Sequence, residues 1–229
     1  MPSSTGLSAM IRDALAQGLR AGRANLIPGI VLWLCGTLII VSYYYVPAAR
    51  NSWEMVADAK EKYGFLFSAC STALFGGIIP YIFQWIAPST RAGLRWSHVG
   101  FFIVFWAVKG MEIDLFYRVQ AWLWGDDNQL STILIKVFVD QIVYVPIWVV
   151  PTMTLAYVFK DAGFRLSGLR EKLGPTPYLT WCLPITLTNW IVWIPAVSLI
   201  YCLPLALQLP VQNLVLCLYV LIILFLTKK

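Results

Sequence analysis

The chain has 229 residues, of which 59% are hydrophobic and only 12% are charged, and its mean hydropathy is +0.72. A soluble domain of this length cannot bury so much apolar surface, so the composition excludes an ordinary soluble protein and indicates an integral membrane protein. The net charge of +6 fits anionic lipid at one membrane face, and it gives no reason to expect a nucleic-acid partner.

The first 25 residues are expected to form a short amphipathic helix that lies at the headgroup level on the cytoplasmic side. Apolar residues recur there at near-helical spacing, with arginines among them. They are Leu7, Met10, Ile11, Leu15 and Leu19, with Arg12, Arg20 and Arg23. A mitochondrial transit peptide has a similar pattern, so this segment alone leaves the compartment open.

Six apolar runs follow, and each is long enough to cross the hydrocarbon. Crossing takes a helix of ~20 residues, because every backbone polar group must be satisfied within the segment. The runs cover residues 26–46, 64–86, 99–124, 131–158, 178–203 and 206–226. We therefore predict an all-α polytopic membrane helix bundle with about six transmembrane helices, in which residues 26–229 form a single transmembrane domain.

The distribution of Lys and Arg predicts that both termini are cytoplasmic, because cytoplasmic loops retain basic residues. With that orientation, eleven basic residues lie inside and three lie outside. The inner residues are Arg12, Arg20, Arg23, Arg91, Arg95, Lys160, Arg165, Arg170, Lys172, Lys228 and Lys229, and the outer ones are Arg50, Lys60 and Lys62. The cytoplasmic face is then expected to attract anionic lipids.

Small residues recur every four positions in the second span, in two adjacent rows. The rows are Ala69, Ala73 and Gly77, and Ser68, Thr72 and Gly76. Small residues at this spacing let two helix backbones approach closely, so the pattern predicts helix packing rather than a functional site.

Four charged residues stand within the third span, in the stretch WAVKGMEIDLFYR. A charge at the bilayer centre costs ~2.5–3.5 kcal/mol on insertion scales, so such residues are expected to be paired, to reach the interface or to contact water. Lys109 and Glu112 are three positions apart, and Asp114 and Arg118 are four apart, so each couple can pair within the helix. The two couples are expected on different faces of the helix.

The fourth span contains the stretch KVFVDQIVYVP, in which Lys136, Asp140 and Gln141 fall within six residues. The cation precedes the anion, which is the less favourable order within one helix, so partners on neighbouring helices are expected. Pro146 and Pro151 each remove a backbone hydrogen bond and are expected to kink the helix. Polar side chains beside a kink could line a water-filled interior, but a buried structural network has the same composition.

Two stretches resemble a known family. KVFVDQIVYVP is similar to the Lys, Asp-Gln and Pro pattern of the small membrane proteins typified by the twenty-two-kilodalton peroxisomal protein and the Mpv-seventeen protein of the mitochondrial inner membrane. NWIVWIPAVSLIYCLPLALQLPVQN resembles the Asn-Trp, Trp-Pro and closing Pro signature of that family. The matching positions are Asn189, Trp190, Trp193, Pro195, Pro204 and Asn213. Ile194 intervenes where the family usually has Trp directly before Pro. Pro195 is expected to kink its helix, as Pro146 and Pro151 are in theirs.

The resemblance covers roughly residues 60–226 and is weaker upstream. In GMEIDLFY, Met111 stands where the family usually has Pro, and Asp114 stands where the family usually has His. In STALFGGIIPYIFQ, Ile79 and Pro80 stand where the family has polar residues. The first span is then an N-terminal extension similar to that of bacterial relatives, which favours a bacterial inner membrane. The mitochondrial inner membrane and the peroxisomal membrane are the alternatives.

The resemblance implies a membrane channel of poorly defined selectivity, with no established catalytic residue set. Because intramembrane ionisable residues are also functional candidates, we expect a pore for small solutes or ions. The residues expected in its polar path, or in a buried network, are Lys136, Asp140, Gln141, Glu112, Asp114, Lys109 and Asn189.

The alternative is a non-conducting scaffold or assembly protein whose buried charges are structural and whose Gln208, Gln212 and Asn213 serve partner helices. A homo-oligomer is compatible with either function. An enzyme is not expected, because the chain has a single His, His98, and lacks motifs such as HExxH. No metal or cofactor is expected, since five cysteines without a CxxC motif lie in apolar segments. They are Cys35, Cys70, Cys182, Cys202 and Cys217.

Overall fold

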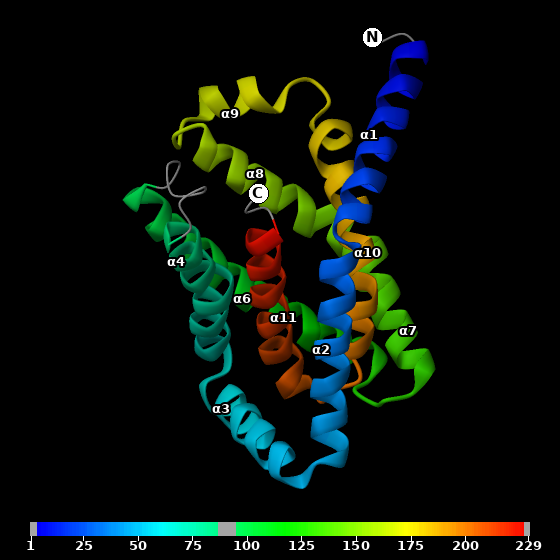
Figure 1. The fold of residues 1–229 in the computed structure, drawn as a ribbon, viewed down its shortest axis with the longest axis vertical. Coiled ribbons are helices and arrows are strands. Elements are labelled where there is room, and N and C mark those ends of the chain that lie inside the picture. Colours follow the sequence, from blue (N-terminus) through cyan, green and yellow to red (C-terminus); the bar gives the residue numbers. More distant parts are fainter. Residues whose placement is uncertain (1–3, 87–94, 227–229) are drawn as a thin grey trace. The chain divides into compact units, whose positions relative to one another are not determined.

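A computed structural model describes residues 4–86 and 95–226 of the chain (Figure 1). Every regular element within these two ranges is helical, so the predicted all-α class is confirmed. Arg91, Lys228 and Lys229, which enter the orientation argument, lie outside the described residues.

The helices follow one another with short connections. The first half contains α1 (Ser4–Ala24), α2 (Leu26–Tyr45), α3 (Pro47–Thr72), η1 (Ala73–Ile78), α4 (Ile79–Ile86) and α6 (Trp96–Trp124). The second half contains α7 (Leu130–Phe138), η2 (Val139–Val149), α8 (Val150–Asp161), α9 (Leu166–Leu173), η3 (Tyr178–Cys182), α10 (Leu183–Ile200) and α11 (Leu205–Leu226).

Five continuous helical stretches of the described chain are long and apolar enough to cross a membrane, which makes the protein a multi-pass membrane protein. They are Leu26–Tyr45, Pro47–Ile86, Leu130–Asp161, Tyr178–Ile200 and Leu205–Ile222. The remaining predicted span is α6, which is long enough at 29 residues. It falls outside the five because Lys109, Glu112, Asp114 and Arg118 lower its hydropathy.

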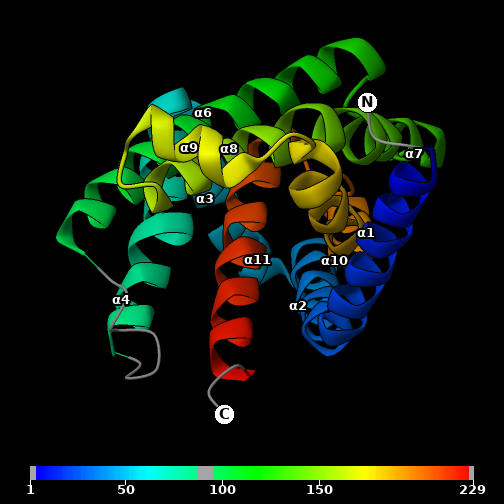
Figure 2. The same cartoon turned by 90° about the horizontal axis from the view of Figure 1, so that it is seen from above.

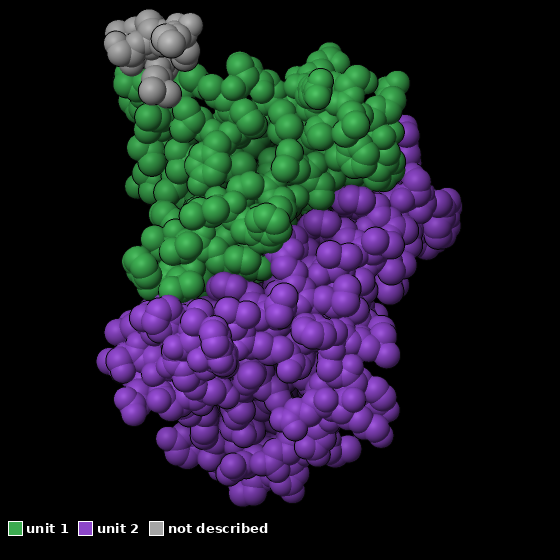
Figure 3. All heavy atoms as spheres, turned by 180° about the vertical axis from the view of Figure 1, so that it is seen from behind, with its two compact units in different colours: residues 1–29, 137–194 green, residues 30–136, 195–229 purple. Residues whose placement is uncertain are grey.

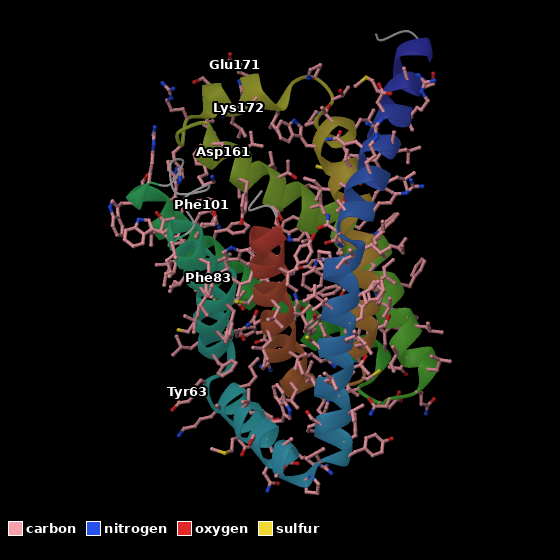
Figure 4. The ribbon with its side chains drawn as sticks, in the orientation of Figure 1. Tyr63, Phe83, Phe101, Asp161, Glu171 and Lys172 are labelled. Carbon is pink, nitrogen blue, oxygen red and sulfur yellow. The ribbon has the colours of Figure 1, made fainter. Side chains whose placement is uncertain are left out.

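The second span begins earlier than the sequence predicts, because residues 47–63 are helical and not a loop. Helix α3 consists of two arms that meet at Gly64, whose φ of 51° and ψ of −127° are not helical. A side chain rarely tolerates this backbone conformation, so glycine permits the bend. The break is visible in Figure 1, and Figure 4 labels Tyr63 directly before it.

Three segments, η1, η2 and η3, are π-helical, and each contains or closely precedes a proline. Proline donates no backbone hydrogen bond and crowds the carbonyl one turn earlier, and a widened turn relieves this clash. Pro80 follows η1, Pro146 lies inside η2 with Pro151 just beyond it, and Pro184 follows η3. The distortion expected at Pro146 and Pro151 thus takes the form of a π-helical segment, whereas α10 remains α-helical around Pro195.

The chain divides into two compact units, which Figure 3 colours separately. Unit 1 comprises residues 1–29 and 137–194, and unit 2 comprises residues 30–136 and 195–229. The chain passes between them inside α2, near the end of α7, and inside α10. The expected organisation, with residues 1–25 followed by a single transmembrane domain, stays a prediction.

In unit 1, the amphipathic helix α1 packs against α10. A Cβ atom added at Gly18 would lie 2.8 Å from Leu187, and one added at Gly22 would lie 2.1 Å from Ile191, so the two glycines allow this close approach. A separate apolar core forms where η2, α8 and η3 meet, around Val145, Val150 and Cys182.

In unit 2, α3, α6 and α11 contact one another and form the centre of the bundle (Figures 1 and 2). The predicted small-residue rows lie at the contact of α3 with α6. A Cβ atom added at Gly110 would lie 2.3 Å from the carbonyl oxygen of Ser68 and 2.5 Å from Thr72 Oγ1. In η1, a Cβ atom added at Gly76 would lie 2.7 Å from the ring of Trp106, and one added at Gly77 would lie 3.3 Å from it. Close helix packing, as the sequence predicts, brings polar groups of α3 against α6.

Candidate functional site

A buried carboxylate, that of Asp114 on α6, lies where α6 contacts α3 in unit 2. Its Oδ2 accepts hydrogen bonds from Lys60 Nζ and from Ser68 Oγ, both at 2.7 Å, and its Oδ1 accepts one from Arg118 Nε at 3.2 Å. Asp114 is 3% exposed and Lys60 is 2% exposed. We call these four residues the Asp114 cluster.

Helix α3 contributes to the Asp114 cluster from both of its arms, Lys60 before Gly64 and Ser68 after it. The contact between Asp114 and Arg118 is the predicted pair within α6 and is confirmed. Lys60 was not predicted as a member of this cluster, because residues 47–63 were expected to form an outer loop. A signal was present, since Lys60 and Gly64 extend the four-residue row of Ser68, Thr72 and Gly76 by two further turns.

Within the Asp114 cluster, the negative charge of Asp114 is neutralised by the positive charges of Lys60 and Arg118. Removing an ion from water costs several kcal/mol, roughly, and a buried pair recovers this only with good geometry and additional hydrogen bonds. Asp114 has both, because two cations and one hydroxyl share its two oxygens. Arg118 has a half-exposed side chain, so its charge can reach the interface while Lys60 is enclosed.

The second predicted couple of α6, Lys109 and Glu112, also pairs as expected. Lys109 Nζ lies 2.9 Å and 3.0 Å from the two carboxylate oxygens of Glu112. The side chain of Glu112 is 23% exposed, against 5% for that of Asp114, so the two acids have different surroundings.

A pocket of about 670 Å³ lies between the arms of α3 and helix α11. Its walls include Ser71 and Asn213, and Asn213 Nδ2 donates to Ser71 Oγ at 3.0 Å. Ser71 Oγ in turn lies 3.4 Å from the backbone carbonyl oxygen of Ser68. The side-chain hydroxyl of Ser68 donates a hydrogen bond to Asp114. Short polar steps therefore connect the pocket wall with the Asp114 cluster.

Lys136 belongs to another buried polar group of unit 2. Its Nζ lies 3.5 Å from the carboxylate of Asp126, which follows α6, and 5.7 Å from the ring centroid of Tyr201. Gln120 Nε2 donates to the carbonyl oxygen of Lys136 at 3.1 Å and to Tyr201 Oη at 2.8 Å. The carboxylate that pairs with Lys136 is therefore that of Asp126. Asp140, which lies one helical turn after Lys136 in the sequence, belongs to unit 1.

Three buried polar atoms of unit 2 have no hydrogen-bond partner within the described part of the chain: Trp106 Nε1, Gln120 Oε1 and Gln208 Oε1. Buried amide oxygens are nearly always paired, with protein or with ordered water. The interior of unit 2 therefore offers polar positions where water could bind.

The remaining predicted residues come together in unit 1. Gln141 Nε2 donates to Asp140 Oδ1 at 3.1 Å, and Asn189 Nδ2 donates to Gln141 Oε1 at 3.3 Å. Trp190 Nε1 donates to the carbonyl oxygen of Gln141 at 2.7 Å. The stretch around Asp140 and the start of the Asn-Trp stretch thus meet between η2 and α10, and this contact could not be read from either stretch alone.

No group of three or more His, Cys, Asp or Glu side chains in the described ranges is arranged to hold a metal ion. The five cysteines are free. No protein family, curated protein or solved structure matches the chain.

Proposed function

We propose that the protein is a member of the channel family that its Lys136 and Asn189 stretches resemble, and that small solutes or ions pass through its helix bundle. The observation that supports this best is the link between the pocket of unit 2 and the Asp114 cluster. A pore needs polar groups inside apolar helices, arranged so that a solute can exchange its hydration for protein contacts.

The hydrogen bonds between the pocket wall and Ser68 give the order in which a solute would meet the polar groups of unit 2. A solute in the pocket would meet Ser71 and Asn213 first, and the Asp114 cluster would lie beyond Ser68. The unpartnered amide oxygens of Gln120 and Gln208 would add water sites within the same unit. Asp140, Gln141 and Asn189 would form a second polar lining in unit 1.

A flux assay in sealed liposomes tests this proposal. The wild type is compared with Asp114→Asn, which keeps the shape of the side chain and removes its charge, and with Asp140→Asn. Asp58→Asn is the matched control, because Asp58 is an exposed acid on α3. We expect both buried changes, or one of them, to alter ion or solute flux by about tenfold, as for the loss of one charged contact worth ~1.4 kcal/mol.

The result for each variant assigns the path. An effect of Asp114→Asn alone would place it in unit 2, and an effect of Asp140→Asn alone would place it in unit 1. If folded and inserted protein gives no more flux than empty liposomes, the pore proposal is overturned.

A non-conducting scaffold is the second candidate. It is favoured by the coordination of Asp114, because a carboxylate with three donors resembles a structural tie between α3 and α6. A scaffold should co-purify with a defined membrane partner and should give the same silent liposomes with every variant.

We further infer that the protein resides in a bacterial inner membrane, with both termini cytoplasmic and anionic lipids at that face. Arg95 and Lys172 would then lie on the cytoplasmic side. Labelling of a cysteine placed at either position by an impermeant reagent outside intact cells would contradict this orientation.

A further inference from the structure

The pocket of unit 2 owes its shape to the bend of α3. The arm before Gly64 contributes one wall, the arm after it contributes a second, and α11 closes the third side. The lining residues are Ser52, Trp53, Met55, Val56, Ala59, Phe67, Ser71, Phe75, Pro210, Asn213 and Leu214. Its volume of about 670 Å³ falls within the range of small-molecule sites.

The lining of this pocket is apolar except at three positions, and none of its residues is ionisable. Trp53, Phe67 and Phe75 provide aromatic surface, which favours an aliphatic or aromatic body. A charged ligand would lack a counter-ion among the lining residues, and burying an unpaired charge is costly. The occupant that fits this chemistry is uncharged.

Asn213 gives the pocket a fixed polar anchor. It is 1% exposed, and it is held by Thr72 Oγ1, which donates to Asn213 Oδ1 at 3.0 Å, and by Ser71 Oγ, which accepts from Asn213 Nδ2 at 3.0 Å. A side-chain amide has two N–H donors and two lone pairs on its oxygen, so one donor and one acceptor remain for a ligand. A hydroxyl or a carbonyl group can use them.

We propose that this pocket is a binding site for an uncharged amphiphile, with an apolar body between Trp53, Phe67 and Phe75 and a single hydroxyl or carbonyl group at Asn213 and Ser71. The proposal concerns binding and holds whether or not the protein conducts. A neutral membrane lipid and a free alcohol or amide share this chemistry, and chain length separates the two sources.

Photo-crosslinking in lipid nanodiscs tests the proposal. The probes are hexadecanol and hexanol that carry a diazirine in the chain, and hexadecanoate with the same diazirine is the charged comparison. Labelled peptides are identified by mass spectrometry. We expect saturable labelling of residues 52–75 and 210–214 by an alcohol, suppressed by an excess of the same alcohol without the diazirine and absent with hexadecanoate.

Two variants test the site itself. Ala59→Phe should fill the pocket and lower the saturable labelling by about tenfold, the change for ~1.4 kcal/mol of binding energy. Ala48→Phe is its control, because Ala48 is an exposed residue of the same arm of α3 and does not line the pocket. Ser71→Ala, a milder change, should weaken labelling by hexadecanol or hexanol without altering the fold.

The outcomes separate clearly. Preference for hexadecanol indicates a lipid occupant, and preference for hexanol indicates a free solute. Labelling that rises in proportion to the probe, that spreads over all helices or that is equal in Ala59→Phe and Ala48→Phe would overturn the proposal. Equal labelling by hexadecanoate would also overturn it. Silent liposomes in the flux assay would leave it standing.

Discussion

Among individual residues, Asp114 and Lys60 form an enclosed ion pair whose disruption should destabilise the fold. Both side chains are enclosed, and each neutralises the other. Removing Asp114 alone leaves the enclosed charge of Lys60 uncompensated, whereas replacing both with apolar residues of similar volume leaves only Arg118, whose half-exposed side chain can reach water. The chemistry of this pair therefore predicts a strongly non-additive response to mutation.

We expect Asp114→Leu to lower the free energy of unfolding by about 3–5 kcal/mol, because Lys60 loses its partner. The double variant Lys60→Met with Asp114→Leu should recover most of that loss. Thermal unfolding in detergent, followed by the fraction that remains monodisperse, compares the wild type, Asp114→Leu, Lys60→Met and the double variant. If the double variant is as unstable as the two single losses combined, the pair does not act as a unit.

Asp127 allows a pH prediction at a position between α6 and the span that begins at Leu130. Hydrogen bonds from the side chain of Thr132 and from the backbone N–H of Gln129 lower the pKa of Asp127. A lowered folded-state pKa means that the ionised form stabilises the fold above the unfolded pKa and that this contribution disappears as the pH falls through the folded pKa.

We therefore expect the stability advantage of the wild type over Asp127→Asn to be present at pH 6 and to shrink below about pH 4, near the ordinary range for Asp. Unfolding temperatures of both proteins across this range measure the advantage. A difference that does not change with pH would show that the hydrogen bonds of Asp127 do not depend on its charge.

At the scale of the element, the bend at Gly64 connects backbone conformation with both the Asp114 cluster and the pocket. A Cβ atom added at Gly64 meets nothing within 4 Å, so a substitution there is strained only through its positive φ. Gly100 on α6 is the matched comparison, because its added Cβ also meets nothing within 4 Å but its backbone is helical.

Gly64→Ala should destabilise the protein by about 1–3 kcal/mol through backbone strain. Gly100→Ala should be neutral or stabilising by up to ~1 kcal/mol, since alanine favours a helix. Unfolding in detergent measures both changes. Equal effects of the two variants would mean that the bend of α3 is not a constrained feature of the fold.

The elements also show where sequence patterns have limits. Apolar runs located five stretches that can cross a membrane, and spacing correctly paired Lys109 with Glu112 and Asp114 with Arg118, because these are local properties of a helix. The helical arm before Gly64 was missed because its polar residues resemble a loop. Lys60 was missed with it, since its partner is distant in the sequence.

For the molecule as a whole, composition indicated a membrane protein, and the length of the apolar runs predicted its all-α class. Long-range contacts were not predictable, because they depend on which helix faces which. Asp126 at Lys136 is one example, and the meeting of Gln141 with Asn189 is another. The polar groups singled out in the sequence therefore belong to separate networks, each within one unit.

We propose that the Asp114 cluster lies on a path for small solutes or ions. Single-channel recording of the purified protein in a planar bilayer tests it most directly, with wild type, Asp114→Asn and Asp58→Asn compared at the same salt concentration. We expect discrete openings whose size or ion preference changes with Asp114→Asn and not with Asp58→Asn. Identical openings in all three proteins, or a silent bilayer with folded and inserted protein, would contradict it.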